Sequence, residues 1–227
     1  MQNGWNENKI FLRGRLSALP SPSHVNHATQ YYLLPLTVSR LSGAEDCLNI
    51  IAAAPLLEGL ELRIGAPVTV SGEVRTFNNR SGVGSKLVVS VFAKFLSQDA
   101  GEDENRLVLA GTLCKPPALR ATPLGRTICD MILAVNRRYG RADYLPCIAW
   151  GSLAHKCAGM NVGDRLSLSG RLQSRRYTKE IDGQLQERTA FEVSVMSLTP
   201  GGSNLSHEVD KVFASGYDEV TYFTRKG

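Results

Sequence analysis

The chain contains an internal duplication, and this repeat constrains the fold more than any other feature of the sequence. When the sequence is shifted against itself by 97 residues, apolar, glycine and charged positions coincide. The coinciding pairs include Leu12 and Leu109, Gly14 and Gly111, Leu36 and Leu133, and Asp46 and Asp143. A solenoid repeat has only about 20 to 50 residues, so the duplicated unit is a whole small domain. The 227 residues are enough for two such domains, each with its own core.

A short acidic segment separates the two copies. Residues 97–104, SQDAGEDE, hold four acidic residues, no basic residue and almost nothing to bury, which is typical of a linker. We therefore expect a first domain over residues 1–96, a linker over 97–104, a second domain over 105–200 and a C-terminal tail over 201–227.

The second copy shows the pattern of a small β-barrel. Five runs rich in β-forming residues, several of them alternating apolar with polar positions, predict strands. These runs are residues 107–113, 127–135, 144–150, 165–172 and 191–198. Between the third and fourth runs, SLAHKCAG predicts a short helix that Ser152 caps and that Gly159 ends in a left-handed conformation. Residues 181–184, IDGQ, predict the turn of a long hairpin between the last two strands.

This order of elements predicts the fold class. Five strands with one helix between the third and fourth are the order of the OB fold, a five-stranded Greek-key barrel. Because the unit is duplicated, we expect an all-β protein with two tandem OB folds, each with a short helix between its third and fourth strands.

No motif predicts catalysis, a cofactor or a metal site. The sequence lacks a Walker A motif, a nucleophile elbow, H-E-x-x-H and a dinucleotide-binding glycine pattern after a strand. The segment RSGVGSK, residues 80–86, resembles a phosphate loop only superficially, since its lysine follows serine and it lies where a hairpin tip is expected. The five cysteines are odd in number and widely spaced, as in reduced core thiols. A nuclease would need a carboxylate cluster, which is not visible.

Two further absences bear on location. The longest apolar stretch falls far short of the roughly 20 residues that cross a bilayer. The first twenty residues lack the basic and apolar regions of a secretion signal. We expect a cytoplasmic protein with no membrane contact.

Positive charge is concentrated in the second copy. Residues 105–200 hold 14 Lys and Arg against 7 Asp and Glu, whereas residues 1–96 hold 9 against 6. The basic residues form one cluster after the second predicted strand and another along the fourth strand and its hairpin. They are Arg137, Arg138, Arg141, Arg171, Arg175, Arg176 and Lys179. Because such cations attract a phosphate backbone and release its counterions, we expect these side chains to contact phosphates.

Aromatic residues lie among these cations. They are Tyr139, Tyr144, Trp150 and Tyr177. Exposed rings stack on unpaired bases at about 1 to 3 kcal/mol per base whatever the base sequence, and duplex DNA hides those base faces. The pattern favours a single-stranded partner. The alternative is that these rings are ordinary strand packing residues, because the period of two does not say which face is the core.

The second copy resembles the bacterial single-stranded DNA-binding protein family. The resemblance covers residues 105–198 and is carried by NRLVLAGTL, PPALRATPLGRTICDMILAVNRR, YLPCIAWGSLAHKC and MNVGDRLSLSGRLQSRRYTKEIDGQ. It implies base stacking by Tyr139, Tyr144, Trp150 and Tyr177. It places the family's basic positions on Arg137, Arg171, Arg175 and Arg176. The implied function is sequence-independent binding and protection of single-stranded DNA in replication, recombination or repair, with no enzymatic activity and no cofactor.

The first copy departs from the family pattern. Cys47, Ala53 and Asn79 stand at three of the four stacking positions. The side chains that remain for DNA contact are Phe77, Arg75, Arg80 and Lys86. We expect this copy to serve assembly or weak DNA contact. Two OB folds per chain resemble the dimeric members of the family, in which four barrels surround the strand, so a homodimer is expected.

The C-terminal sequence also differs from the family, whose tail ends in an acidic tip that recruits replication and repair proteins. Here the last residues are GYDEVTYFTRKG, so the resemblance does not predict that recruitment. An alternative is therefore an OB-fold adaptor of a replication-restart complex that acts mainly through protein contacts. The exposure of Trp150 and of the basic surface distinguishes the two hypotheses.

Overall fold

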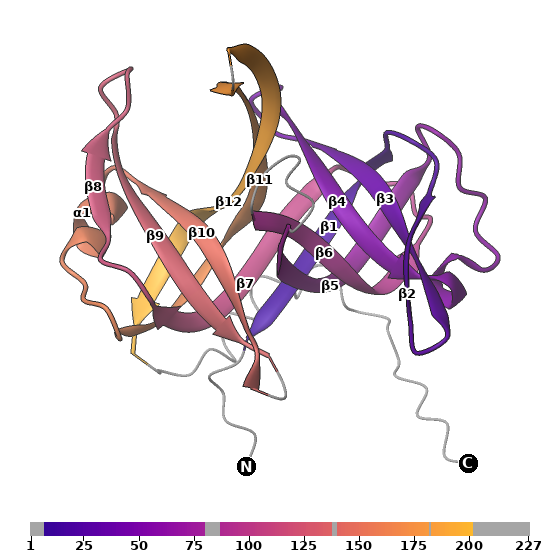
Figure 1. The fold of residues 1–227 in the computed structure, drawn as a ribbon, viewed down its shortest axis with the longest axis horizontal. Coiled ribbons are helices and arrows are strands. Elements are labelled where there is room, and N and C mark those ends of the chain that lie inside the picture. Colours follow the sequence, from indigo (N-terminus) through magenta and orange to yellow (C-terminus); the bar gives the residue numbers. More distant parts are fainter. Residues whose placement is uncertain (1–6, 80–86, 138–139, 182, 202–227) are drawn as a thin grey trace.

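The computed structural model describes residues 7–79, 87–137, 140–181 and 183–201, and most of them lie in β-strands. Figure 1 shows two β-barrels side by side, the first copy in indigo and purple and the second in magenta to yellow. No helix in the described part of the chain is long and apolar enough to cross a membrane. The prediction of an all-β protein with two tandem OB folds is confirmed.

The first barrel contains six strands and a 3-10 helix. They are β1 (Asn8–Leu16), β2 (Ser21–Asn26), β3 (Thr29–Ser39), β4 (Glu45–Ala53), η1 (Ala54–Leu57), β5 (Pro67–Asn78) and β6 (Leu87–Ser97). Strand β1 pairs antiparallel with both β3 and β5, and β4 pairs in parallel with β6. These pairings close the sheet into a barrel, so alternate residues of β4 are buried inside it.

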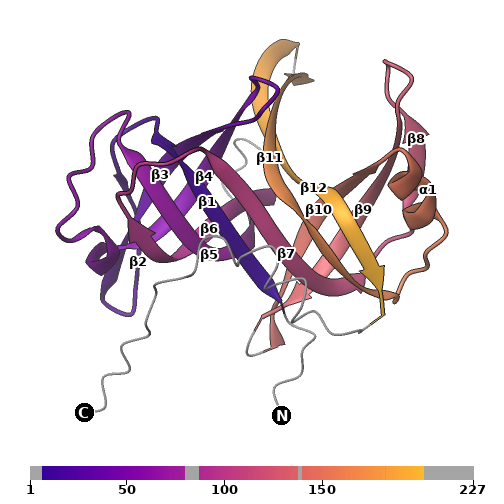
Figure 2. The same ribbon diagram turned by 180° about the vertical axis from the view of Figure 1, so that it is seen from behind.

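The second barrel repeats this arrangement. Its elements are β7 (Glu104–Leu113), β8 (Ala118–Ala121), β9 (Thr127–Asn136), β10 (Ala142–Trp150), α1 (Ser152–Ala158), β11 (Arg165–Ile181) and β12 (Gln184–Pro200). Strand β7 pairs with β9 and β11, and β10 pairs in parallel with β12. The long hairpin of β11 and β12 is confirmed, and it extends well beyond the body of its barrel (Figures 1 and 2).

The structure differs from the sequence prediction in three local features. Each barrel has a sixth strand at the edge, β2 or β8, in which every residue is exposed and no alternation marks the strand. In the first copy the connection after β4 forms a 3-10 turn with Pro55 in its first positions. The caps assigned to α1 were wrong, because Gly151 is the N-cap residue without a side-chain cap and Gly159 has a φ of −82°.

Two glycines allow the sheets to fold over themselves. Gly72 and Gly170 lie at β-bulges, where β5 and β11 shift register against β6 and β12. A Cβ atom would lie 2.1 Å from the carbonyl oxygen of Phe92 at the first position and 2.2 Å from that of Ser194 at the second. Only glycine fits such a close approach of two backbones.

The core of each barrel is apolar, and the core of the second barrel also contains the buried thiols of Cys129, Cys147 and Cys157. The fully buried side chains include Leu36 and Leu48 in the first barrel and Leu109 and Leu133 in the second. Burial raises the pKa of the Cys157 thiol to about 11, so this group stays protonated at neutral pH.

The two barrels are joined through their first strands. β1 pairs antiparallel with β7, which makes one continuous sheet of twelve strands. Figures 1 and 2 both show β1 and β7 side by side between the barrels. Asn8 pairs with Leu109 and Leu12 pairs with Asn105, and the 97-residue offset converts each of these pairs into the other. The two copies are therefore related by a local two-fold rotation, as in a symmetric dimer within one chain.

Candidate nucleic-acid interface

A buried ion pair of the second barrel holds the end of β5 from the first barrel. Asp143, at the start of β10, is 0% exposed and forms a salt bridge with Arg137, which follows β9. The Oδ1 atom of Asp143 accepts hydrogen bonds from the Thr76 backbone N–H at 2.5 Å and from the Thr76 hydroxyl at 3.1 Å. Arg137 Nη2 also donates to the Thr76 carbonyl oxygen at 3.0 Å. A buried carboxylate is tolerated here because its oxygens are paired and hydrogen-bonded.

The same contact occurs with the barrels exchanged. Asp46 of the first barrel is 1% exposed, forms a salt bridge with Arg40 and accepts a hydrogen bond from the Ser174 N–H at 2.7 Å. The Cys47 N–H donates to the Ser174 hydroxyl at 2.8 Å. These reciprocal hydrogen bonds hold β5 against the second barrel and β11 against the first, so the outer faces of the two barrels keep a fixed relation.

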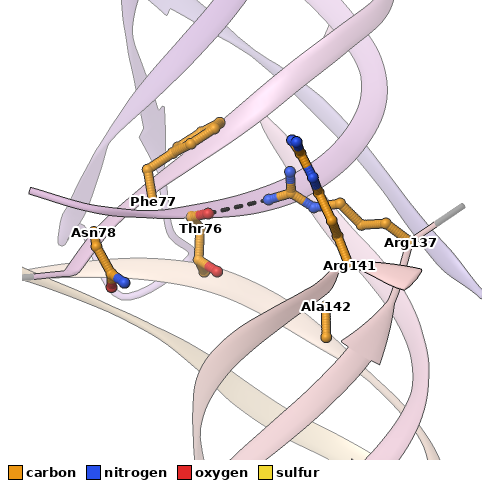
Figure 3. Close-up of a pocket in the computed structure, with 6 residues that line it drawn as sticks. All are labelled: Thr76, Phe77, Asn78, Arg137, Arg141 and Ala142. Carbon is orange, nitrogen blue, oxygen red and sulfur yellow. Dashed lines mark hydrogen bonds between the residues drawn. The ribbon is translucent and has the colours of Figure 1, made fainter. Parts of the chain in front are cut away.

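An open cleft of about 490 Å³ lies where β5 meets the second barrel (Figure 3). Its lining residues are Thr76, Phe77, Asn78, Arg137, Arg141 and Ala142. Phe77 is 46% exposed, and the Arg137 guanidinium lies 5.4 Å from the centre of its ring. The cleft therefore combines the aromatic ring of Phe77, which belongs to the first copy, with the guanidinium groups of Arg137 and Arg141, which belong to the second.

The outer face of β10 continues from this cleft. Tyr144 and Trp150 are 52% and 38% exposed, whereas the alternating residues Leu145, Cys147 and Ala149 are buried in the barrel. The Tyr144 N–H donates to the Thr76 hydroxyl at 3.1 Å, which places this tyrosine at the edge of the cleft. At about 3.3 Å per residue, the two aromatic residues lie roughly 20 Å apart along the strand.

The β11–β12 hairpin carries the second basic cluster. Arg171, Arg175 and Tyr177 share one face of β11, and the Arg175 guanidinium lies 5.6 Å from the centre of the Tyr177 ring. Arg176 is exposed. Within the described residues, the buried Nε of Arg171 has no hydrogen-bond partner.

Three of the sequence-predicted site residues cannot be placed. Arg138 and Tyr139 lie outside the described residues, and so does the side chain of Lys179. In the first copy, Arg80 and Lys86 also lie outside them. Arg75 is paired with Glu73 at 2.5 Å.

Sequence reasoning missed the contact between the two copies at the cleft. Phe77 was assigned to a weak site of the first copy alone, but the structure places it beside Arg137 of the second. One signal was present, because Asp46 matches Asp143 at the 97-residue offset and Thr76 matches Ser174 at an offset of 98, after one inserted residue. These matching positions indicate a contact between the copies only when it is known that the two barrels pack against each other.

Two fused OB folds that present exposed aromatic rings beside arginines define an OB-fold protein of the nucleic-acid-binding class. Residues 104–199 match the Single-strand binding protein family. The chain is 34% identical over 120 residues to "Single-stranded DNA-binding protein 3" of Clostridium acetobutylicum, and the match covers 49% of this chain and 83% of that protein. The chain therefore belongs to the single-strand binding protein family.

Other relatives agree with this assignment. The "Single-stranded DNA-binding protein" of Clostridium tetani is 40% identical over 80 residues, which are 32% of this chain and 55% of that protein. A crystal structure of a deletion mutant of the single-stranded DNA binding protein from Thermus aquaticus superposes with a TM-score of 0.70 and 25% identity. That superposition covers 89% of this chain and 98% of the other, so the likeness extends over both barrels.

Proposed function

We propose that the protein coats single-stranded DNA without sequence preference, in the cytoplasm, during replication, recombination or repair. The observation that carries this proposal is the exposure of Tyr144 and Trp150 on one outer face of β10, beside the arginine-lined cleft. Large rings left in solvent at both ends of a strand contribute little to the barrel core, but they suit stacking on unpaired bases.

The candidate site residues of the second barrel divide into three roles. Tyr144, Trp150 and Tyr177 stack on bases, with Tyr139 as a fourth ring. Arg141, Arg171, Arg175 and Arg176 neutralise phosphates, with Arg138 and Lys179 as further cations. Arg137 is a positioning residue, because Asp143 and the Thr76 carbonyl occupy its guanidinium and it covers Phe77.

The division of the chain follows from this assignment. Residues 105–200 supply the main DNA-binding face, residues 97–104 connect the copies, and residues 1–96 contribute assembly and further contact. The tail from residue 202 onward lies outside the described residues. We also propose a homodimer, since two chains with two barrels each give the four barrels that the family resemblance implies. Light scattering should then give twice the 24.7 kDa chain mass.

Fluorescence anisotropy with labelled oligo-dT tests the function. Trp150→Ala and Tyr144→Ala should each lower affinity by about 1 to 3 kcal/mol. Leu124→Ala is the matched control, because Leu124 is a large side chain that is 84% exposed in the turn before β9. Duplex DNA of equal length should bind far more weakly. Equal affinity for both DNA forms, or no effect of either aromatic substitution, would instead favour the adaptor hypothesis.

A further inference from the structure

A row of π-systems crosses the first barrel, where the family's stacking positions hold small or polar residues. The rings of His24 and Tyr31 are stacked, with centroids 4.8 Å apart and planes 4° from parallel. The Tyr31 ring lies 5.5 Å from that of Phe92, and the Arg75 guanidinium lies 5.3 Å from the centre of the Phe92 ring. We call these four side chains the aromatic row. They come from β2, β3, β6 and β5, which lie in this order in the sheet with β4 in the middle (Figure 1).

The aromatic row lies on the face that corresponds to the DNA-binding face of the second barrel. Tyr31 pairs directly with Ala53 in the β3–β4 ladder. Directly paired residues of an antiparallel ladder point to the same face. The 97-residue offset aligns Ala53 with Trp150, so Tyr31 and Trp150 belong to equivalent outer faces.

The position of Phe92 on this face follows from its equivalent residue in the second barrel. It pairs with Ile51 in the parallel β4–β6 ladder, and Ser194 pairs with Ile148 in the parallel β10–β12 ladder. Because Ile51 and Ile148 match at the offset, Phe92 corresponds to Ser194.

The two barrels therefore distribute aromatic side chains differently on equivalent surfaces. In the second barrel a tryptophan on the central strand pairs with Ile128, and the position that corresponds to Phe92 holds the small Ser194. In the first barrel the central strand carries Ala53, and the rings stand on the strands to either side. Since the Ala53 side chain is only a methyl group, the rings of Tyr31 and Phe92 can meet above β4.

Cations accompany the aromatic row. Arg75 and Lys94 both form salt bridges with Glu73, which leaves a net positive charge of one among the three. The Lys94 side chain is 60% exposed. Burial acts to raise the pKa of Glu73, but its bonds to Lys94 and Arg75 outweigh burial and lower that pKa below the ordinary value. The group of three charges therefore persists at neutral pH.

We propose that the aromatic row is a second base-stacking surface for single-stranded DNA. The first barrel then binds DNA by rings on β2, β3 and β6, and it does not depend on the four positions that the family resemblance assigns. The inference rests on the proposed function, and it makes the first barrel a stacking platform in its own right.

Two leucine substitutions in the full chain test the row. Tyr31→Leu and Phe92→Leu should each weaken binding of a long oligo-dT by at least about fivefold and shorten the length of DNA that the protein occludes. Phe95→Leu is the matched control, because Phe95 is on the same strand as Phe92, is 39% exposed and lies outside the row. It should bind like the unmodified protein.

Two outcomes of these titrations would overturn the inference. One is unchanged affinity and occluded length in both row variants. The other is a fall in the mass measured by light scattering, which would make the row an interface between copies of the chain. Failure of the proposed function is distinguishable, because then the unmodified protein would bind no oligo-dT or Trp150→Ala would leave binding unchanged.

A cross-linking experiment on the unmodified protein does not depend on how the variants fold. Oligonucleotides that contain bromodeoxyuridine are irradiated in the complex, and the modified peptides are identified by mass spectrometry. The inference predicts adducts at His24, Tyr31 or Phe92 in addition to adducts in the second barrel. Adducts confined to residues 105–200 would overturn it.

Discussion

Asp143 of the second barrel accepts hydrogen bonds from both the backbone N–H and the hydroxyl of Thr76 of the first barrel. Asp46 and Ser174 make the corresponding contact with the barrels exchanged. The strand that each barrel offers to the other is therefore held by a buried carboxylate that its own arginine neutralises. This pair of contacts, with the β1–β7 ladder, determines where the two outer faces lie relative to each other.

Replacing the buried carboxylate should destabilise the protein. In Asp143→Asn the Arg137 guanidinium loses its buried partner, so we expect a loss of about 3 to 5 kcal/mol in the free energy of unfolding. Urea denaturation followed by circular dichroism measures this quantity. Asp130→Asn is the control, since the Asp130–Arg120 pair is 41% and 51% exposed and should change stability by less than about 1 kcal/mol. Equal effects of the two substitutions would contradict the structural role of Asp143.

Removing the phosphate contact that we propose for Arg141 should change the salt dependence of binding. In Arg141→Ala the slope of log affinity against log salt concentration should become less negative by about 0.7, the value for one phosphate of a single strand. Binding titrations over a range of NaCl concentrations give the slope. Arg63→Ala is the comparison, because Arg63 is exposed in the turn that precedes β5, away from the cleft. A slope that shifts equally in both variants would mean that Arg141 acts only through overall charge.

The Tyr177 ring on the β11–β12 hairpin should contribute to DNA binding only by stacking through its π-face. Tyr177→Ala should weaken oligo-dT binding by about 1 to 3 kcal/mol, while Tyr177→Phe should retain most of the affinity because the ring remains. Equilibrium titrations of the two variants side by side measure the difference. If Tyr177→Phe lost as much as Tyr177→Ala, the hydroxyl and not stacking would be the important group.

The different aromatic arrangements of the two barrels can be exchanged. The double variant Tyr31→Ile with Ala53→Trp gives the first barrel the Ile128 and Trp150 pattern of the second. We expect it to bind a long oligo-dT more tightly than Tyr31→Ile alone, because a ring returns to the outer face. The new tryptophan should also be quenched by DNA. Affinity equal to that of Tyr31→Ile would argue against base stacking on this face.

Much of the fold could be predicted from the sequence, since the 97-residue offset and the period of two are properties of the chain alone. The edge strands β2 and β8 were missed because every residue in them is exposed, so burial leaves no alternation to detect. The N-cap of α1 was also missed, because Gly151 provides no side-chain oxygen.

Less of the site between the barrels could be predicted from the sequence. Tyr144 and Trp150 were located correctly on a strand and Tyr177 on the long hairpin, but whether the rings of β10 face the core or the solvent could be decided only from the closed barrel. The contact of Phe77 with Arg137 depends on the relative placement of two domains, which no local pattern contains. Tyr31 and Phe92 were not predicted as site residues, because the alignment of the two copies compares equivalent positions. These two rings lie instead on β3 and β6, the strands on either side of β4.

The exposed ring of Trp150 allows the most direct test of the central claim. In a Trp5→Phe variant the remaining tryptophan fluorescence comes from Trp150, and oligo-dT is titrated until binding saturates. The account predicts strong quenching that saturates at a defined ratio of nucleotides to protein, with little change when duplex DNA of equal length is added. Fluorescence that stays constant while anisotropy shows the same oligo-dT binding would contradict base stacking on β10.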